Sequence, residues 1–253
     1  PGGVDELRLL IDLHSEGLRQ GPGGDHETRL AVELSGLQPA ANLRVADIGC
    51  GTGASTLVLA RELDAHITAV DFLPGFLAKL EANARRAGLA DRITTLSASM
   101  EALPFAAAEL DAIWSEGAIY NMGFAAGIKA WREYLKPNGV LAISELTWLT
   151  EQRPEELQAH WDQEYPEVDT ASGKLAVLER LGFSPIGYFP LPDCCWLDNY
   201  YQPMRRRFSD FLGRHANSDE ARAIVAAEEK EISLYERHKA FVSYGYYIAR
   251  KVA

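Results

Sequence analysis

The chain has 253 residues, of which 47% are hydrophobic, and a formal net charge of −11. This length supports one large domain with a packed core. Nucleic acid is a poor expectation as a partner, because gripping a phosphate backbone requires a concentrated positive face, and no apolar run approaches the ~20 residues that a membrane helix needs.

The three cysteines, Cys50, Cys194 and Cys195, argue against two kinds of site. Their odd number and the adjacency of two of them do not form a disulfide framework, and their spacing does not match that of metal ligands. We therefore expect a reducing, cytoplasmic location and no bound metal.

The first 36 residues read as two helices joined by a glycine-rich loop. Apolar residues recur at helical spacing up to residue 18, and Gly21–Gly24 form a flexible loop. Asp25 can cap the helix that follows, and Gly36 can end it.

Strand and helix patterns then alternate at short spacing. Buried strands are expected at residues 43–49, 66–71, 92–98, 110–117 and 140–146, with helices at 54–63, 74–88 and 125–135. This alternation is typical of an α/β fold in which a doubly wound, mostly parallel sheet is covered by helices.

Polar side chains stand at or near the ends of these strands: Asp47, Asp71, Ser99, Glu116 and Glu145. In doubly wound sheets, ligands bind at the carboxyl ends of the strands, near the switch in strand order. Five such residues are hard to explain as core packing, so the pattern predicts a binding site at this edge.

The stretch "VADIGCGTGA" holds a glycine turn whose ligand is open to two interpretations. Gly49, Gly51 and Ala54 satisfy the dinucleotide pattern G-x-G-x-x-[GA], and Asp71 could hold a ribose. Asp47 discriminates, because a carboxylate there would repel a pyrophosphate, which helix N-terminal amides bind. It would favour a ligand that carries an ammonium and a sulfonium. A turn that serves only to lead a strand into a helix is the remaining alternative.

The chain resembles the class I S-adenosylmethionine-dependent methyltransferases. "VADIGCGTG", "ITAVD", "SASMEALPF", "LDAIWSEGAIYN" and "WREYLKPNGVLAISE" are similar to successive motifs of that family, in order, over about residues 20 to 150. The resemblance is closest to the small-molecule branch with the ubiquinone and menaquinone methyltransferases, the "methyltransferase type 11" pattern. It implies a Rossmann-like sheet of seven strands whose last strand is antiparallel, with a helical lid.

The same resemblance implies S-adenosylmethionine as the cofactor. The residues expected to bind it are Asp47, Gly49, Gly51, Gly53, Asp71, Phe72, Ser99, Met100 and Glu116. Ser99 stands where many relatives have an acid beside the adenine, and the amide of Met100 can meet a ring nitrogen. "SEGAIY" lacks the Asn/Asp-Pro-Pro-aromatic motif, which argues against methylation of adenine or of glutamine amides.

Methyl transfer from a sulfonium is an in-line displacement, so the enzyme must align the nucleophile with the sulfur–methyl bond. A general base is needed only if the nucleophile arrives protonated. The catalytic candidates are Glu116, Glu145 and His26, of which His26 reads equally well as an exposed residue beside the glycine-rich loop.

Past residue 149 the resemblance weakens. We expect a helix within residues 150–170 that begins near Pro154, a sixth strand within 183–201, a helical stretch from about 202 to 239 and a seventh strand within 240–253. The expected organisation is residues 1–36 as N-terminal helices and cofactor-covering loop, 37–150 as cofactor-binding core, and 151–253 as lid and last two strands.

The acceptor should meet aromatic side chains. The candidates in the segments expected to face the transfer point are Tyr120, Trp148, Trp196, Tyr200 and Tyr201. Aromatic faces with Glu116 and Glu145 suit an amine or a cation. A phenol or quinol would stack on the same rings, and packing alone would also explain them.

The leading hypothesis is therefore methyl transfer to a small molecule that is an amine or is phenol- or quinol-like. The alternatives are an NAD-dependent oxidoreductase and a non-catalytic S-adenosylmethionine-binding protein. The acceptor atom and the oligomeric state stay open, with a homodimer as one option.

Overall fold

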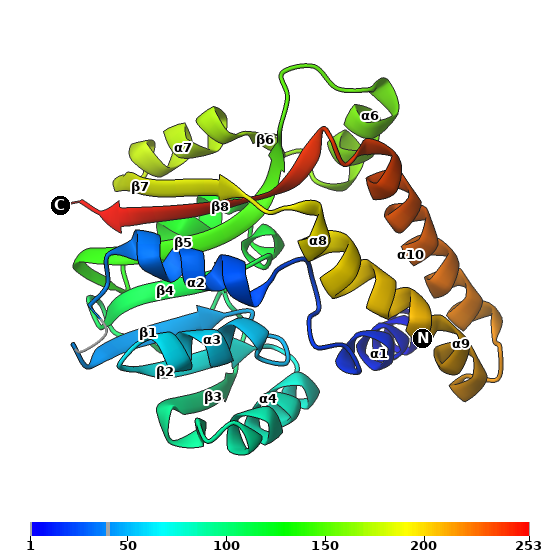
Figure 1. The fold of residues 1–253 in the computed structure, drawn as a ribbon, viewed down its shortest axis with the longest axis horizontal. Coiled ribbons are helices and arrows are strands. Elements are labelled where there is room, and N and C mark those ends of the chain that lie inside the picture. Colours follow the sequence, from blue (N-terminus) through cyan, green and yellow to red (C-terminus); the bar gives the residue numbers. More distant parts are fainter. Residues whose placement is uncertain (1, 39–40, 253) are drawn as a thin grey trace.

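The structure is a computed structural model that describes residues 2–38 and 41–252. Pro1, Pro39, Ala40 and Ala253 lie outside the described residues, so the outermost bounds of the expected segments 1–36 and 151–253, and two residues within 37–150, are not described. Two layers of helices enclose a central sheet (Figure 1).

The sheet has the strand order β3-β2-β1-β4-β5-β8-β7. Its strands are β1 (Leu43–Ile48), β2 (Ala65–Asp71), β3 (Ile93–Ser97), β4 (Leu110–Glu116), β5 (Leu135–Trp148), β7 (Phe183–Pro190) and β8 (Val242–Lys251). Only β8 is antiparallel to its neighbours, β5 and β7. A two-residue strand, β6 (Asp169–Thr170), pairs with the end of β5. The expected mostly parallel seven-stranded sheet with an antiparallel last strand is confirmed.

The sheet is apolar on both faces because helices cover both. On β1, Val45 belongs to the core cluster on one face and Ala46 to the cluster on the other. Such continuous apolar runs are typical of buried parallel strands. The helices of the first face are α2 (Asp25–Ser35), α3 (Ala54–Glu62) and α4 (Pro74–Arg86), and those of the second are α5 (Phe124–Arg132) and α7 (Ala171–Arg180). Short 3₁₀ turns lie at η1 (Ala90–Arg92) and η2 (Ile119–Asn121).

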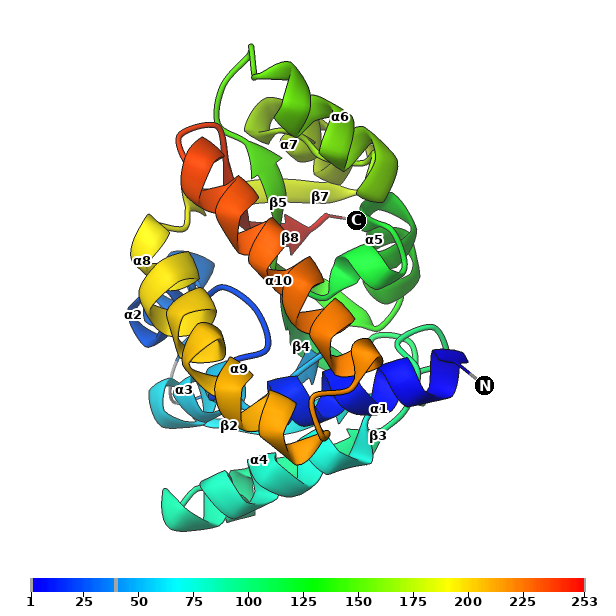
Figure 2. The same ribbon diagram turned by 90° about the vertical axis from the view of Figure 1, so that its right-hand side faces the viewer.

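A third group of helices lies beyond the carboxyl ends of the parallel strands. Helix α1 (Gly2–Ser15) contacts both α9 (Gln202–Arg214) and α10 (Asp219–His238). Figure 2 shows these three helices in front of the strand ends, with α6 (Glu155–Glu164) above them. They form the helical cover that a lid requires.

The helical stretch expected from about 202 to 239 consists of two helices, α9 and α10, because the chain turns between them. Ala216 and Asn217 adopt left-handed backbone angles, with φ of +54° and +52°. Ser218 then caps α10, since its side chain accepts a hydrogen bond from the amide of Ala221.

Other boundaries were predicted in part. Gly36 ends α2 in the left-handed conformation as expected, but the N-cap is Gly24 rather than Asp25. The segment 183–201 contains the sixth strand and then a helical turn, α8 (Asp193–Trp196), continued by a π-helical turn, η3 (Leu197–Tyr201). Helix α7 was not predicted. Among the described residues, no helix is both long and apolar enough to span a membrane.

Candidate functional site

The site begins at the turn from β1 into α3. Gly49, Gly51 and Gly53 all have positive φ, at +73°, +56° and +97°. A Cβ on Gly49 would lie 2.3 Å from the Cβ of Ala118, and one on Gly51 would lie 2.2 Å from Oε1 of Gln20. Only glycine fits this backbone, which leaves the strand end open to a ligand.

Asp47 lies buried directly behind this turn. Its Oδ2 accepts hydrogen bonds from Ser55 Oγ at 3.0 Å and Thr56 Oγ1 at 2.7 Å. Its Oδ1 is buried and has no partner among the described residues. Burial raises the pKa of Asp47 to about 7. A buried oxygen without a donor is costly, so this atom is suited to a cationic donor from a ligand.

Asp71 connects the ends of β1 and β2. Its Oδ2 accepts from the amide of Gly51 at 2.9 Å, and its Oδ1 accepts from the amide of Leu73 at 3.0 Å. A carboxylate has about four acceptor positions, so both oxygens keep room for a hydroxyl donor such as a ribose.

A cavity of about 820 Å³ opens over this turn. Seven of the nine expected cofactor residues line it, namely Gly49, Gly51, Asp71, Phe72, Ser99, Met100 and Glu116. The other two, Asp47 and Gly53, lie behind the turn. Phe72 is 67% exposed at the rim, so its ring is free to cover a flat group.

Glu116 ends β4 inside this cavity with its oxygens already engaged. Its Oε2 accepts from Thr28 Oγ1 and from the Tyr246 hydroxyl, both at 2.6 Å. Its Oε1 lies 3.6 Å from Nη1 of Arg19. This carboxylate is therefore placed to hold a donor in position rather than to act as a free base.

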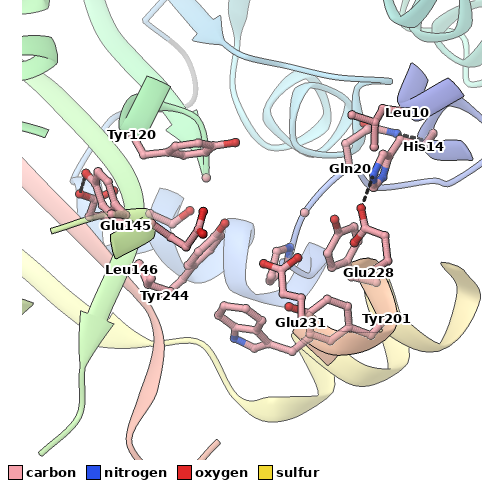
Figure 3. A pocket seen from close by; sticks show the side chains of 18 of the residues that line it. Leu10, His14, Gln20, Tyr120, Glu145, Leu146, Tyr201, Glu228, Glu231 and Tyr244 are labelled. Atoms are coloured by element: carbon pink, nitrogen blue, oxygen red, sulfur yellow. Dashed lines mark hydrogen bonds and ion pairs between the residues drawn. The ribbon is translucent and has the colours of Figure 1, made fainter. Parts of the chain in front are cut away.

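A second cavity, of about 510 Å³, adjoins the first. The linings of the two cavities share Gln20, Gly21, Pro22, Gly117 and Tyr120, among others. The second cavity extends away from the glycine turn between α1, β5, α6, η3 and α10 (Figure 3). The adjoining arrangement suits a cofactor in one cavity and an acceptor in the other.

Glu145 lines the second cavity as part of a buried ion pair. Its Oε2 accepts from Lys174 Nζ at 2.9 Å and from the Tyr165 hydroxyl. The side chains of Glu145 and Lys174 are each 2% exposed. Burial raises the pKa of Glu145, and Lys174 opposes that shift. The carboxylate is thus neutralised by its partners, which weakens its candidacy as a catalytic base.

The structure also places one expected catalytic residue and one expected acceptor residue outside both cavities. His26 is exposed on α2 and lines neither. Trp148 is buried in the core at the end of β5, opposite Val242 on β8, with the Arg153 guanidinium 4.4 Å from its ring. It lies away from the site because β5 extends past Glu145 and pairs there with β6 and β8. The other acceptor candidates, Tyr120, Trp196, Tyr200 and Tyr201, line the second cavity.

The N-terminal loop contributes residues that the motifs did not reveal. Gln20 closes over the glycine turn, because its Oε1 accepts from the amide of Thr52 at 2.9 Å. Gly23 donates to the carbonyl of Cys195 at 3.3 Å and accepts from Asn199 Nδ2 at 2.8 Å. The glycine-rich loop is therefore fastened across the top of the site.

Helix α10 contributes Glu228 and Glu231, which sequence reasoning also missed. The helix is so highly charged that it reads as a solvated element. The available signal was spacing, since Glu228 and Glu231 lie on the same helical face as the buried Ile224 and Tyr235.

Comparisons with known proteins agree with this geometry. Residues 45–139 match the family described as "Methyltransferase domain". A malonyl-[acyl-carrier protein] O-methyltransferase from Dechloromonas aromatica is 31% identical over 122 residues, which are 47% of this chain and 43% of that protein. The chain spans about half the length of the curated relatives it matches.

Solved structures share the whole fold. A SAM-dependent methyltransferase from Geobacter sulfurreducens in complex with S-adenosyl-L-homocysteine superposes with a TM-score of 0.84 at 20% identity, covering 96% of this chain and 98% of that one. The [4+2]-cyclase SpnF superposes with a TM-score of 0.75, also at 20% identity, covering 100% and 96%. At this identity, the likeness shows the fold alone.

Proposed function

We propose that this chain, in which residues 45–139 are a methyltransferase domain, transfers a methyl group from S-adenosylmethionine to an amine nitrogen of a small molecule. The observation that carries the proposal is the pair of adjoining cavities. One holds the glycine turn and its carboxylates, and the other is lined by aromatic and acidic side chains.

The first cavity fits this cofactor in charge and shape. When bound, S-adenosylmethionine supplies an electrophilic methyl group on a sulfonium. The carboxylate of Glu116, which lines this cavity, would hold its ammonium, and the buried carboxyl of Asp47 behind the turn would favour the positive charge. Asp71 would hold the ribose hydroxyls, with Phe72 and Ser99 beside the adenine. Three carboxylates at one turn disfavour the pyrophosphate of NAD, which requires amides and positive charge.

The second cavity favours an amine over a phenol or quinol. Among the described residues that line it, none is a lysine or an arginine. A phenol or quinol must lose a proton to a base before attack. Glu145 is engaged by Lys174 and Tyr165, and Glu116 already faces three donors. A neutral amine needs no such base.

The proposal extends to the organisation and location of the chain. Residues 1–36 act as the cover of the cofactor, 37–150 as its binding core, and 151–253 as lid and last strands. The contacts of α1 with α9 and α10 support this division. A reducing, cytoplasmic compartment is supported by three cysteines that are all unpaired.

Calorimetry followed by turnover tests the proposal. S-adenosylmethionine should bind and NAD should not, and Gly51→Ala should weaken cofactor binding at least ten-fold because its Cβ would enter the site. Gly88→Ala is the matched control, since Gly88 also has positive φ but open space around it. Incubation with a panel of amines and phenols should then release S-adenosylhomocysteine with amines.

Three results would contradict the proposal in different ways. Binding of NAD in place of S-adenosylmethionine would make the chain an oxidoreductase candidate. Cofactor binding with no turnover on any acceptor would favour a non-catalytic S-adenosylmethionine-binding protein, or a protein of the same fold that does not transfer methyl groups. Turnover confined to phenols or quinols would reassign the acceptor.

A further inference from the structure

Acidic side chains are concentrated on the side of the second cavity that α6 and α10 form. Glu164, Glu228 and Glu231 line this cavity but not the cavity of the glycine turn. In Figure 3, Glu228 and Glu231 lie on the opposite side of the cavity from Glu145. The acidic side chains on α10 therefore face the strand end that carries Glu145 across the cavity.

Two of these carboxylates have few or no partners. Glu228 Oε1 lies 3.3 Å from His14 Nε2, but its Oε2 is buried without a partner among the described residues. Glu231 has no hydrogen bond or ion pair within the part of the chain that the structure describes. Burial raises the pKa of Glu231 to about 7, and the charges of Glu228 and Glu164 raise it further. Desolvated carboxylates of this kind are unfavourable until a cation joins them.

A second, independent observation points to a ligand at the same place. Tyr201 is 2% exposed and lines this cavity, and its hydroxyl has no hydrogen bond among the described residues. The rings of Tyr200 and Trp196 lie beside it, with centroids 5.1 and 6.0 Å from that of Tyr201. Ring faces attract a desolvated cation by ~0.5–2 kcal/mol, and a phenolic oxygen can accept a hydrogen bond from it.

The nitrogen that is methylated cannot be the group that these carboxylates hold. It must present a lone pair when it attacks, whereas a carboxylate pair stabilises the protonated form of an amine. We infer that Glu228 and Glu231, together with Tyr201, bind a cationic group of the acceptor, an ammonium or a guanidinium, that is distinct from the nitrogen that is methylated. The inference rests on the proposed function for the reacting end, and it narrows the substrate class to molecules that carry a reacting amine nitrogen and a separate cationic group.

Direct binding of simple amines tests the inference without requiring turnover. The probes are α,ω-diaminoalkanes of three to six carbons and 1-aminoalkanes of the same lengths, titrated by calorimetry into protein saturated with S-adenosylhomocysteine. At least one diamine should bind ten-fold or more tightly than its matched monoamine. Glu231→Gln and Glu228→Gln should each reduce that preference at least five-fold.

Glu220→Gln is the matched control, because Glu220 is exposed on the same helix and lines neither of the two cavities. It should leave the preference unchanged. Neither glutamine variant of the cavity should lower the Tm, because each removes an unpaired or half-paired buried carboxylate. Both variants should bind S-adenosylhomocysteine as tightly as the wild type does, which would show that they are folded.

The outcomes separate the two proposals. Equal affinities for diamines and monoamines, no binding of either, or a preference that survives in both glutamine variants would overturn the cation site. Release of S-adenosylhomocysteine with other amines would still support the proposed function in those cases. Selective diamine binding without any affinity for S-adenosylmethionine or S-adenosylhomocysteine would support the cation site and overturn the proposed methyltransferase.

Discussion

The three carboxylates around the glycine turn have different surroundings, and this difference assigns them different tasks. Asp71 accepts two backbone amides and faces the cavity, so it combines a structural and a ligand-binding role. Asp47 is buried with one oxygen unsatisfied. Glu116 is fixed by two hydroxyls near Arg19. Only Asp71 is placed for hydroxyl donors on a neutral part of the ligand.

Asp71→Ala should therefore weaken the methylated and the demethylated cofactor equally. Each hydrogen bond to a charged group contributes about 1.5–3 kcal/mol, so we expect both dissociation constants, measured by calorimetry, to rise at least ten-fold. Glu101→Ala is a suitable control, because Glu101 lines the same cavity but is exposed. A loss confined to one form of the cofactor would show that Asp71 senses the sulfonium instead of the ribose.

At the scale of single elements, the ion pair of Lys174 and Glu145 fixes α7 to β5 and, through the Tyr165 hydroxyl, holds the end of α6 at the acceptor cavity. Removing one partner of such a pair leaves a buried charge and costs ~3–5 kcal/mol. Lys174→Met should therefore lower the Tm by roughly 6–20 °C for a chain of this size.

The double variant Lys174→Met with Glu145→Gln should recover most of this loss in a thermal melt, because no charge is then left unpaired. Lys136→Met is the control, since Lys136 forms its pair with Asp111 at the surface, where such pairs contribute ~0–1 kcal/mol. A double variant as unstable as the single one would assign the loss to packing of the lysine stem.

The elements differ in how far the sequence predicts them, and the reason is the range of the interactions that define each. The strand Leu43–Ile48, the glycine turn and the position of Asp71 follow from local patterns of burial and turn chemistry, so the elements within residues 43–146 and most residues that line the first cavity were predictable. The break at Ala216–Ser218 was missed because its left-handed residues are not glycines. The position of Glu231 in a cavity was missed because helical spacing shows which face of α10 is buried, whereas the packing of α10 against α1 and α9 decides what that face lines.

At the scale of the whole molecule, two desolvated carboxyls at the site lower the free energy of unfolding of the ligand-free protein. Burial raises the pKa of both Asp47 and Glu231 to about 7, whereas both groups titrate near pH 4 in an unfolded chain. Between these values the folded state binds more protons than the unfolded state. The free energy of unfolding therefore falls as the pH rises from about 4 to 7.

We expect the Tm of the ligand-free protein to fall between pH 5 and pH 8 and the decline to level off above that range. A pKa shift of this size at one carboxyl corresponds to on the order of 3 kcal/mol.

The net charge of −11 acts in the same direction through general repulsion, so variants must isolate the local effect. Glu231→Gln should show a shallower decline than the wild type, because it no longer ionises at the crowded end of the cavity beside Glu228 and Glu164. Glu220→Gln removes the same charge from the exposed surface of α10 and should decline as steeply as the wild type. The Tm values are measured by differential scanning calorimetry. If the Tm declines equally with pH in all three proteins, the carboxylate of Glu231 does not titrate in this range.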